Sequence, residues 1–219
     1  RKITNRRALL RTQRKMGIRI CRCYRTVSTE AVLVLARTVP WTIIVGERVE
    51  MYERNKVYAA AHDPDAEEPD TRNDEEIRKA SLDKWQAEWS VAEKGAWTRL
   101  CIPDVRPWYE RDFGSVTYFT AQVLTGHGDF QSFLAKIRKT DSDICDICDE
   151  GVIDDVEHTV LKCPTLAHAR DDLHATDVPS LMQRMLNSEE EWNTITERIG
   201  AILKEKNTKR KEIEAVRLG

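Results

Sequence analysis

Four potential metal ligands lie within nineteen consecutive residues, and this cluster constrains the fold more than any other feature of the chain. Segment 145–163 reads CDICDEGVIDDVEHTVLKC and holds three of the six cysteines and one of the five histidines. The spacing is Cys145-x2-Cys148-x9-His158-x4-Cys163. A C-x2-C pair can bind one ion through a tight turn, and a His-x4-Cys pair can converge on it from a following turn or short helix. The pattern predicts a tetrahedral metal site.

The donor types favour zinc as the ion. Thiolate and imidazole suit a borderline-soft cation, and four protein ligands leave no open position, so we expect a structural Zn²⁺ and not a catalytic one. Segment 140–163 contains too few large apolar side chains for a core of its own, so metal binding would supply the missing folding free energy. The alternative is that three reduced cysteines and a histidine lie near one another by chance.

Acidic residues surround the predicted ligands. Because a zinc ion with three thiolates is itself net negative, we do not expect this surface to attract a phosphate backbone. We call the predicted metal-binding segment 145–163 the knuckle. Two interpretations of it stay open: it stabilises protein packing, or it binds nucleic acid directly with help from neighbouring cations. The acids are Asp141, Asp143, Asp146, Asp149, Glu150, Asp154, Asp155 and Glu157, and the cations are Lys136, Arg138, Lys139 and Lys162.

The first 29 residues carry ten lysines and arginines and no acid. Interspersed leucine, isoleucine and methionine predict a helix with one buried side and one basic side. Such a surface is typical of contact with nucleic-acid phosphates, and the alternative is a solvated basic face. The predicted nucleic-acid contacts are Arg6, Arg7, Arg11, Arg14, Lys15, Arg19, Arg22 and Arg25 from this helix, with Lys136, Arg138 and Lys139 before the cysteine cluster.

Composition favours a folded, mainly α protein. Apolar residues make up 41% of the chain, including six tryptophans, whereas only nine glycines and seven prolines are present among 219 residues. No apolar run approaches the roughly 18 residues of a membrane span, and no signal-peptide pattern opens the chain. We therefore expect an intracellular protein, nuclear and cytoplasmic, with no membrane partner. Arg1 is not an initiator residue, so we expect an excerpt of a longer polypeptide.

Periodicity predicts several helices. Ser28 and Glu30 mark the start of a short apolar helix before Pro40, and a second helix follows. An aromatic stripe predicts one helix over 74–100, and Ser188 with Glu191 forms a capping box for the last helix. The other predicted helices are 41–60, 115–126, 129–139 and 164–174. The five predicted parts are a basic helical segment (1–61), an acidic linker (62–76), a helical segment (77–140), the zinc knuckle with its following helix (141–176) and C-terminal helices (177–219).

The remaining conspicuous residues favour structural interpretations. Tryptophans at helical spacing indicate core, lone cysteines indicate packed thiols, and His127 between two glycines indicates a hydrogen-bonding residue at a bend. The closing stretch 204–217 mixes six basic residues with three acids and predicts a frayed, solvated helix end. The tryptophans are Trp85, Trp89 and Trp97, and the thiols are Cys21, Cys23 and Cys101.

Three blocks, 13–52, 97–114 and 124–170, together resemble the C-terminal part of reverse-transcriptase polyproteins of arthropod non-LTR (LINE-type) retrotransposons. The order of motifs carries the resemblance: QR…YRTVS, then LTGHG, then a Cys-Cys-His-Cys knuckle. The resemblance implies that the first block belongs to the thumb and connection after the polymerase palm. It also implies a role in gripping template RNA or primed target DNA during target-primed reverse transcription, beside upstream polymerase domains of the same polyprotein.

Catalytic motifs are missing from the sequence. We find no paired-aspartate polymerase motif, no endonuclease constellation and no acidic quartet of an RNase H domain, so this segment should be inactive alone although its parent would be an RNA-directed DNA polymerase. The leading hypothesis is an accessory nucleic-acid-binding segment. The alternative is a zinc-stabilised protein-interaction scaffold, in which the basic helix packs against an acidic partner.

Overall fold

The computed structural model describes residues 2–60, 72–170 and 173–218. Within these ranges the chain forms helices joined by loops, with a single isolated antiparallel bridge between Ile144 and Ile153. This confirms the predicted mainly α class. Residues 62–71 of the predicted acidic linker (62–76) lie outside the described residues.

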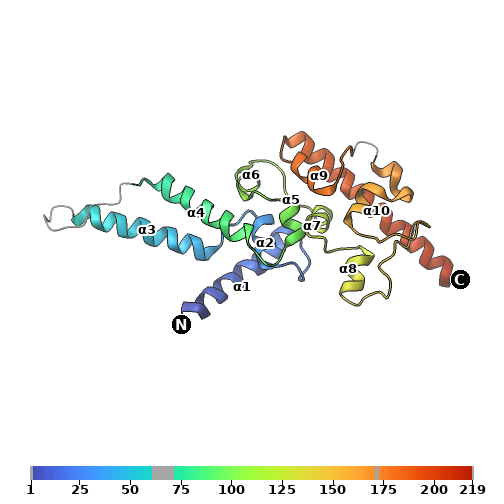
Figure 1. Cartoon of the computed structure of the whole chain (residues 1–219), viewed down its shortest axis with the longest axis horizontal. Helices are drawn as coiled ribbons and strands as arrows, with labels where there is room; N and C mark the ends of the chain where they lie inside the picture. The colour runs from blue at the N-terminus through green and yellow to red at the C-terminus, as the bar shows by residue number, and fades with distance from the viewer. Residues whose placement is uncertain (1, 61–71, 171–172, 219) are drawn as a thin grey trace.

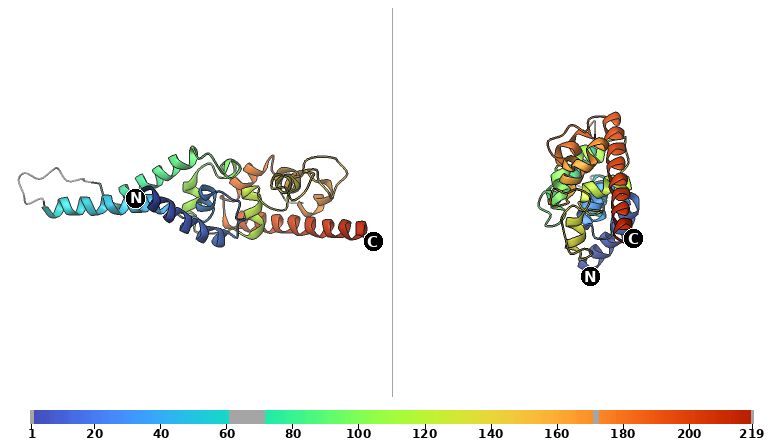
Figure 2. Two further views of the ribbon diagram at one scale, coloured as in Figure 1. Left: turned by 90° about the horizontal axis from the view of Figure 1, so that it is seen from below. Right: turned by 90° about the vertical axis from the view of Figure 1, so that its right-hand side faces the viewer.

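The molecule is elongated. Helices α3 (Trp41–Ala60) and α4 (Asp74–Ser90) project at one end, and the C-terminal end of α10 (Glu189–Leu218) projects at the other (Figure 1). Figure 2 shows α10 as a long helix along one side of the molecule. None of the described helices is long and apolar enough to cross a membrane.

The N-terminal helices are α1 (Lys2–Cys21) and α2 (Thr29–Leu35). Helix α2 begins as predicted, because the Ser28 side chain accepts a hydrogen bond from the Ala31 amide at 3.2 Å. The predicted extent of the basic helix is wrong at its end. Arg22 adopts a left-handed φ of 54°, and the Cys23 amide bonds the Ile18 carbonyl at 3.0 Å, which closes α1 in a Schellman motif.

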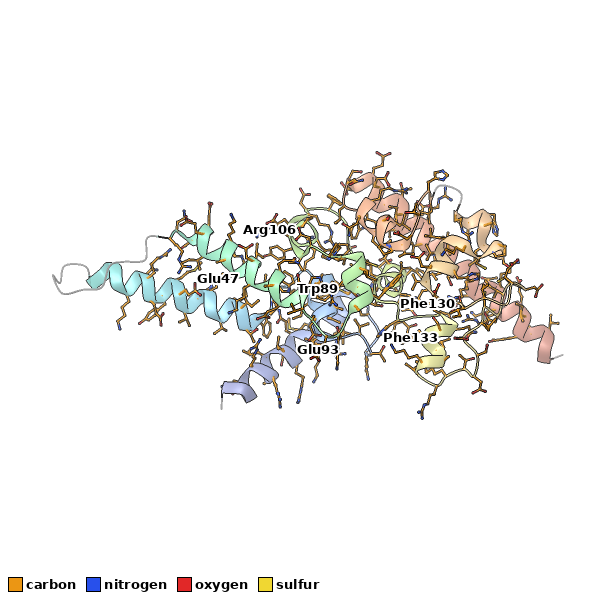
Figure 3. All side chains as sticks on the ribbon, viewed as in Figure 1. Glu47, Trp89, Glu93, Arg106, Phe130 and Phe133 are labelled. Atoms are coloured by element: carbon orange, nitrogen blue, oxygen red, sulfur yellow. The ribbon has the colours of Figure 1, made fainter. Side chains whose placement is uncertain are left out.

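The predicted helix over 74–100 is two helices. Helix α4 ends at Ser90, and α5 (Ala96–Cys101) begins after Gly95, whose φ of 77° suits a residue without a side chain. The break lets two indoles of the stripe reach different partners: Trp89 Nε1 donates to the Ile102 carbonyl at 2.8 Å, and Trp97 Nε1 donates to the Val123 carbonyl at 2.7 Å. Figure 3 places Trp89 near the middle of the molecule.

Three short helices follow: α6 (Val105–Glu110), which the sequence did not predict, α7 (Tyr118–Thr125) and α8 (Gln131–Lys136). The last two correspond to the predicted helices over 115–126 and 129–139 and are shorter. His127 fulfils its predicted structural role, since its Nδ1 lies 2.9 Å from the Thr26 hydroxyl and its ring stacks on Phe133.

The C-terminal elements are η1 (His158–Lys162), η2 (Pro164–Arg170), α9 (Val178–Arg184) and α10. The predicted helix over 164–174 corresponds to the 3₁₀ helix η2, and residues 171 and 172 lie outside the described residues. Helix α10 begins where the Ser188 hydroxyl accepts from the Glu191 amide, as predicted. Its predicted apolar stripe is buried and consists of Trp192, Ile195, Ile199 and Ile202.

The prediction of a frayed, solvated helix end over 204–217 is wrong for its first half, whereas most side chains from 211 to 216 are exposed. Helix α10 continues to Leu218, and Lys206 within it is fully buried. A continuous set of packed apolar side chains reaches from Cys21 through Trp89 and Phe130 to Leu203, and it includes Cys145 of the cysteine cluster. The cluster therefore packs against the rest of the helical core.

Candidate metal centre

The predicted metal ligands meet in space. One ligand atom from each of Cys145, Cys148, His158 and Cys163 lies within 4.8 Å of all the others, and Cys148 is the least buried of the four. Cys148 Sγ lies 3.5 Å from His158 Nε2. Three sulfurs and one imidazole nitrogen at this separation could hold one metal ion, which fits a tetrahedral donor set.

A small hairpin positions the first two ligands. The Cys145 amide donates to the Val152 carbonyl, and the Asp154 amide donates to the Asp143 carbonyl, both at 2.8 Å. Gly151 closes the turn with a φ of 63°. This short pairing holds the C-x2-C loop against the chain that leads to the histidine.

A π-helical turn positions the other two ligands. Element η1 starts at His158, and the Cys163 amide donates to the His158 carbonyl at 2.6 Å, an i to i+5 bond. His158 and Cys163 are five positions apart. In an α-helix, with 3.6 residues per turn, side chains at this spacing point in different directions. The wider turn brings His158 and Cys163 to the same side.

Lysine 206 of α10 anchors the chain beside these ligands. Its fully buried ammonium donates to both carboxylate oxygens of Asp154 at 2.7 Å, to the Asp129 carbonyl at 2.7 Å and to the Thr159 hydroxyl at 2.9 Å. Asp154 is also fully buried and accepts a further bond from the Gln131 amide at 2.8 Å. This buried ion pair is therefore fully hydrogen-bonded, the condition under which such a pair is tolerated.

Arginine 210 lies one turn further along α10. Its Nε donates to Asp146 at 2.7 Å, and its Nη1 contacts Asp129. Burial alone would lower the pKa of Arg210, but the hydrogen bonds and charges of Asp146 and Asp129 raise it overall. Two of the eight acids predicted to ring the ligands, Asp146 and Asp154, are therefore neutralised internally by α10.

The predicted nucleic-acid contacts of α1 fall into two groups. Arg7, Arg11, Lys15 and Arg19 follow one another at intervals of four residues, are exposed, and have no ion pair within the described residues. Arg6 and Arg14 are engaged: Arg6 lies 3.7 Å from Glu88, and Arg14 Nη2 donates to the carbonyls of Arg25 and Val27 at 2.6 and 2.7 Å. We call the first group the α1 cation row.

The remaining predicted contacts lie outside regular helix or at a helix end. Arg22 and Arg25 are exposed in the turn after α1, and Lys136 is the last residue of α8. Arg138, with a φ of 58°, and Lys139 follow it and are also exposed. The cysteines outside the cluster are buried free thiols, as predicted: Cys21, Cys23 and Cys101.

Comparison with known proteins gives several relatives of one kind. The Retrovirus-related Pol polyprotein from type-1 retrotransposable element R1 4 of Nasonia vitripennis is 34% identical over 171 residues, which cover 73% of this chain and 42% of the relative. The corresponding R1 polyprotein of Bradysia coprophila is 32% identical over 161 residues, covering 71% of this chain and 16% of the relative. This chain is homologous to part of the R1 Pol polyproteins.

A third relative, the R1 2 polyprotein of Nasonia vitripennis, is 31% identical over 151 residues and covers 64% of this chain. The chain spans less than half the length of each of these R1 Pol relatives, 35% in this third case. No family model and no solved structure matches it. The resemblance to polyproteins of non-LTR retrotransposons is thereby confirmed.

Burial sets the protonation of the ligand residues in this R1 Pol homologue. Burial raises the pKa of the Cys145 and Cys163 thiols; Cys148 raises that of Cys145 further, and Cys145 raises that of Cys163. Burial lowers the pKa of His158 against the opposing charges of Asp154 and Asp155. A neutral imidazole is ready to bind metal, whereas the thiols must lose protons to do so, so metal uptake should release protons.

Sequence reasoning missed the two α10 cations that support this site in the R1 Pol homologue. A signal was available in the spacing, because Lys206 continues the buried stripe at four residues beyond Ile202 and Arg210 follows at four more. A cation in register with a buried apolar stripe indicates an internal acid as its partner.

Proposed function

We propose that this segment of an R1 Pol homologue is an accessory nucleic-acid-binding element whose C-terminal part is held in shape by a structural zinc ion. The observation that carries the proposal is the α1 cation row. Four exposed cations, none paired with a carboxylate in the part of the chain that the structure describes, share one helix face, and α1 offers no acid of its own to neutralise them.

The geometry of the row suits a polyanion. Residues four apart on an α-helix are about 6 Å apart along its axis, so the row from Arg7 to Arg19 extends over about 18 Å. A nucleic-acid backbone carries phosphates at regular intervals, and each cation that neutralises a phosphate releases a condensed counterion. In the parent polyprotein the bound strand would be template RNA or primed target DNA.

The zinc ion would act as a brace. Three thiolates and an imidazole form a closed four-ligand set, which fits a structural role with no position left for substrate. Each segment that supplies ligands is also held by α10, through Asp146 between the first two cysteines and Thr159 beside the histidine. Metal and α10 would therefore stabilise the same loop from two sides.

Binding to single-stranded RNA and to a primed duplex, measured at several salt concentrations, tests the nucleic-acid proposal. The variant Arg11→Gln/Lys15→Gln should weaken binding and reduce the salt slope by about 0.7 to 0.9 for each lost contact. The matched control Lys56→Gln/Lys79→Gln removes the same charge from exposed positions of α3 and α4 and should leave the slope unchanged. Absent binding, or equal losses in both variants, would overturn the proposal.

Zinc content per chain tests the metal proposal. The wild-type protein and Cys101→Ser should each retain one equivalent, because Cys101 lies outside the ligand group. Cys148→Ser should lose it and lower the free energy of unfolding, since metal binding and folding are coupled. A metal-free wild type with an unchanged fold would contradict the assignment of these residues as ligands.

A further inference from the structure

The knuckle presents apolar side chains to solvent. Ile144, Val152 and Ile153 are 37%, 40% and 51% exposed, although each is a β-branched residue of a kind normally buried. The bridge between Ile144 and Ile153 keeps two of them side by side. Their exposure is therefore built into the same hairpin that positions Cys145.

A cavity opens beside these residues. It has a volume of about 520 Å³ and adjoins the predicted metal ligands, because its lining includes His158. The other lining residues are Glu150, Val152, Ile153, Asp155, Glu157, Lys162 and Pro164. This volume falls within the range of about 300 to 1,000 Å³ that ligand sites commonly occupy. An apolar anchor could enter it between acidic walls.

The acids around this cavity differ from those that face α10. Glu150 is exposed and has no ion pair within the described residues, and the same holds for Asp149 across the turn. Glu157 accepts a bond from the Val178 amide through Oε1, but its shielded Oε2 has no donor among the described residues. Lys162 offsets only part of this charge.

We propose that the outer face of the knuckle, defined as Ile144, Glu150, Val152, Ile153, Asp155 and Glu157, docks a basic segment of protein chain with apolar anchor residues. The partner is selected by charge, because a phosphate backbone is repelled whereas lysine or arginine side chains are attracted to the exposed Glu150 and Asp155. Apolar anchors in the cavity would contribute most of the affinity. This surface is separate from the α1 cation row and goes beyond nucleic-acid binding.

Two synthetic peptides test this proposal on the zinc-loaded full chain. One alternates lysine with valine and the other alternates lysine with serine, and both are followed by fluorescence anisotropy. The lysine–valine peptide should bind at least tenfold more tightly than the lysine–serine peptide. The affinity of the lysine–valine peptide should fall with added salt. It should also fall in the variant Glu150→Gln, because Glu150 is exposed on this face. Equal binding of the two peptides would overturn the proposal.

A pair of variants distinguishes binding at the outer face from non-specific binding of the peptide to exposed apolar side chains. Val152→Ser/Ile153→Ser should weaken the lysine–valine peptide at least tenfold while retaining one zinc per chain. The matched control Val91→Ser/Val216→Ser removes two apolar side chains that are 80% and 82% exposed elsewhere and should bind the peptide normally. Unchanged binding in the first variant would overturn the proposal.

The two sites are distinguished by a crossed measurement. Arg11→Gln/Lys15→Gln should weaken RNA and leave peptide binding unchanged, whereas Val152→Ser/Ile153→Ser should do the reverse. If the outer-face variant loses affinity for RNA and keeps its affinity for the peptide, the knuckle binds nucleic acid and the peptide proposal is wrong. The proposed role of the α1 cation row would be unaffected.

Discussion

Helices α1 and α10 are both rich in cations, but they use them in opposite ways. On α1 the cations of the row extend into solvent without carboxylate partners among the described residues, whereas on α10 the ammonium of Lys206 is fully buried and Arg210 is held by two aspartates. The difference lies in acids supplied by other segments. Asp129, Asp146 and Asp154 pair with α10, whereas none of the acids that the structure describes pairs with the row. Charge density along a sequence therefore does not by itself separate a binding surface from an internal brace.

The largest expected effect comes from removing the buried ammonium of Lys206. Lys206→Met leaves the buried Asp154 carboxylate with only Arg210, at 3.9 Å, as a cationic partner and should lower the free energy of unfolding by about 3 to 5 kcal/mol. Urea unfolding of the zinc-loaded protein measures it. Lys211→Met removes an exposed lysine of the same helix and should change stability by less than about 0.5 kcal/mol.

A second substitution shows whether the lost charge is the cause. Lys206→Met/Asp154→Asn keeps an acceptor for the Gln131 backbone amide but removes the buried negative charge, so it should be more stable than Lys206→Met alone. If the double variant is the less stable of the two, Lys206 acts through packing and the comparison between the helices fails.

An intermediate effect is expected inside α1, where Arg14 behaves like an α10 cation. Arg14→Ala removes two hydrogen bonds to carbonyls of the following turn and should cost about 1 to 2 kcal/mol of stability, whereas Arg11→Ala should cost less than about 0.5 kcal/mol. RNA affinity should show the reverse order. Thermal and urea unfolding, paired with RNA titration, measure both quantities, and identical profiles would remove the distinction between the row and Arg14.

The smallest expected effect concerns Lys136, which is exposed yet close enough to a histidine to influence it. Burial lowers the pKa of His127 below its usual 6.5, and the charge of Lys136 lowers it further. Because the folded-state pKa is the lower one, stability should decline as pH falls below about 6.5, where His127 of the unfolded chain gains its proton first.

Lys136→Met should therefore raise the pKa of His127 part of the way toward 6.5, with burial keeping it depressed. An NMR titration of the imidazole measures this shift directly. Lys139→Met is the matched control and should leave the titration unchanged. A wild-type pKa at or above 6.5 would show that the ring is not desolvated as described.

The sequence predicted the grouping of three cysteines and a histidine, and most helices, because their signals are local. The spacing from Cys145 to Cys163 needs only one turn and one hairpin, and the Ser28 cap and the Trp192 stripe are each confined to a few residues. Helix ends were predicted less well for a definite reason. Left-handed residues that close helices are usually glycine, but Arg22, Arg37 and Arg138 take that conformation here, so no glycine marked the ends of α1, α2 and α8.

The support of the site was not predictable from local signals. The partners of Lys206 lie 47 to 77 positions earlier in the sequence, so neither spacing nor composition near residue 206 reveals them. Local sequence does not reveal the π-helical turn at His158 either, because this turn depends on packing around the cluster more than on helix propensity.

The long separation between Asp154 and Lys206 has a consequence for synthesis. A ribosome completes all four predicted metal ligands by residue 163, yet Lys206, the nearest cation to Asp154, is added only 43 residues after that point. Until then the nascent knuckle holds a carboxylate that must stay hydrated. Transcripts cut short between these positions would encode every metal ligand and still yield a knuckle without its closing helix.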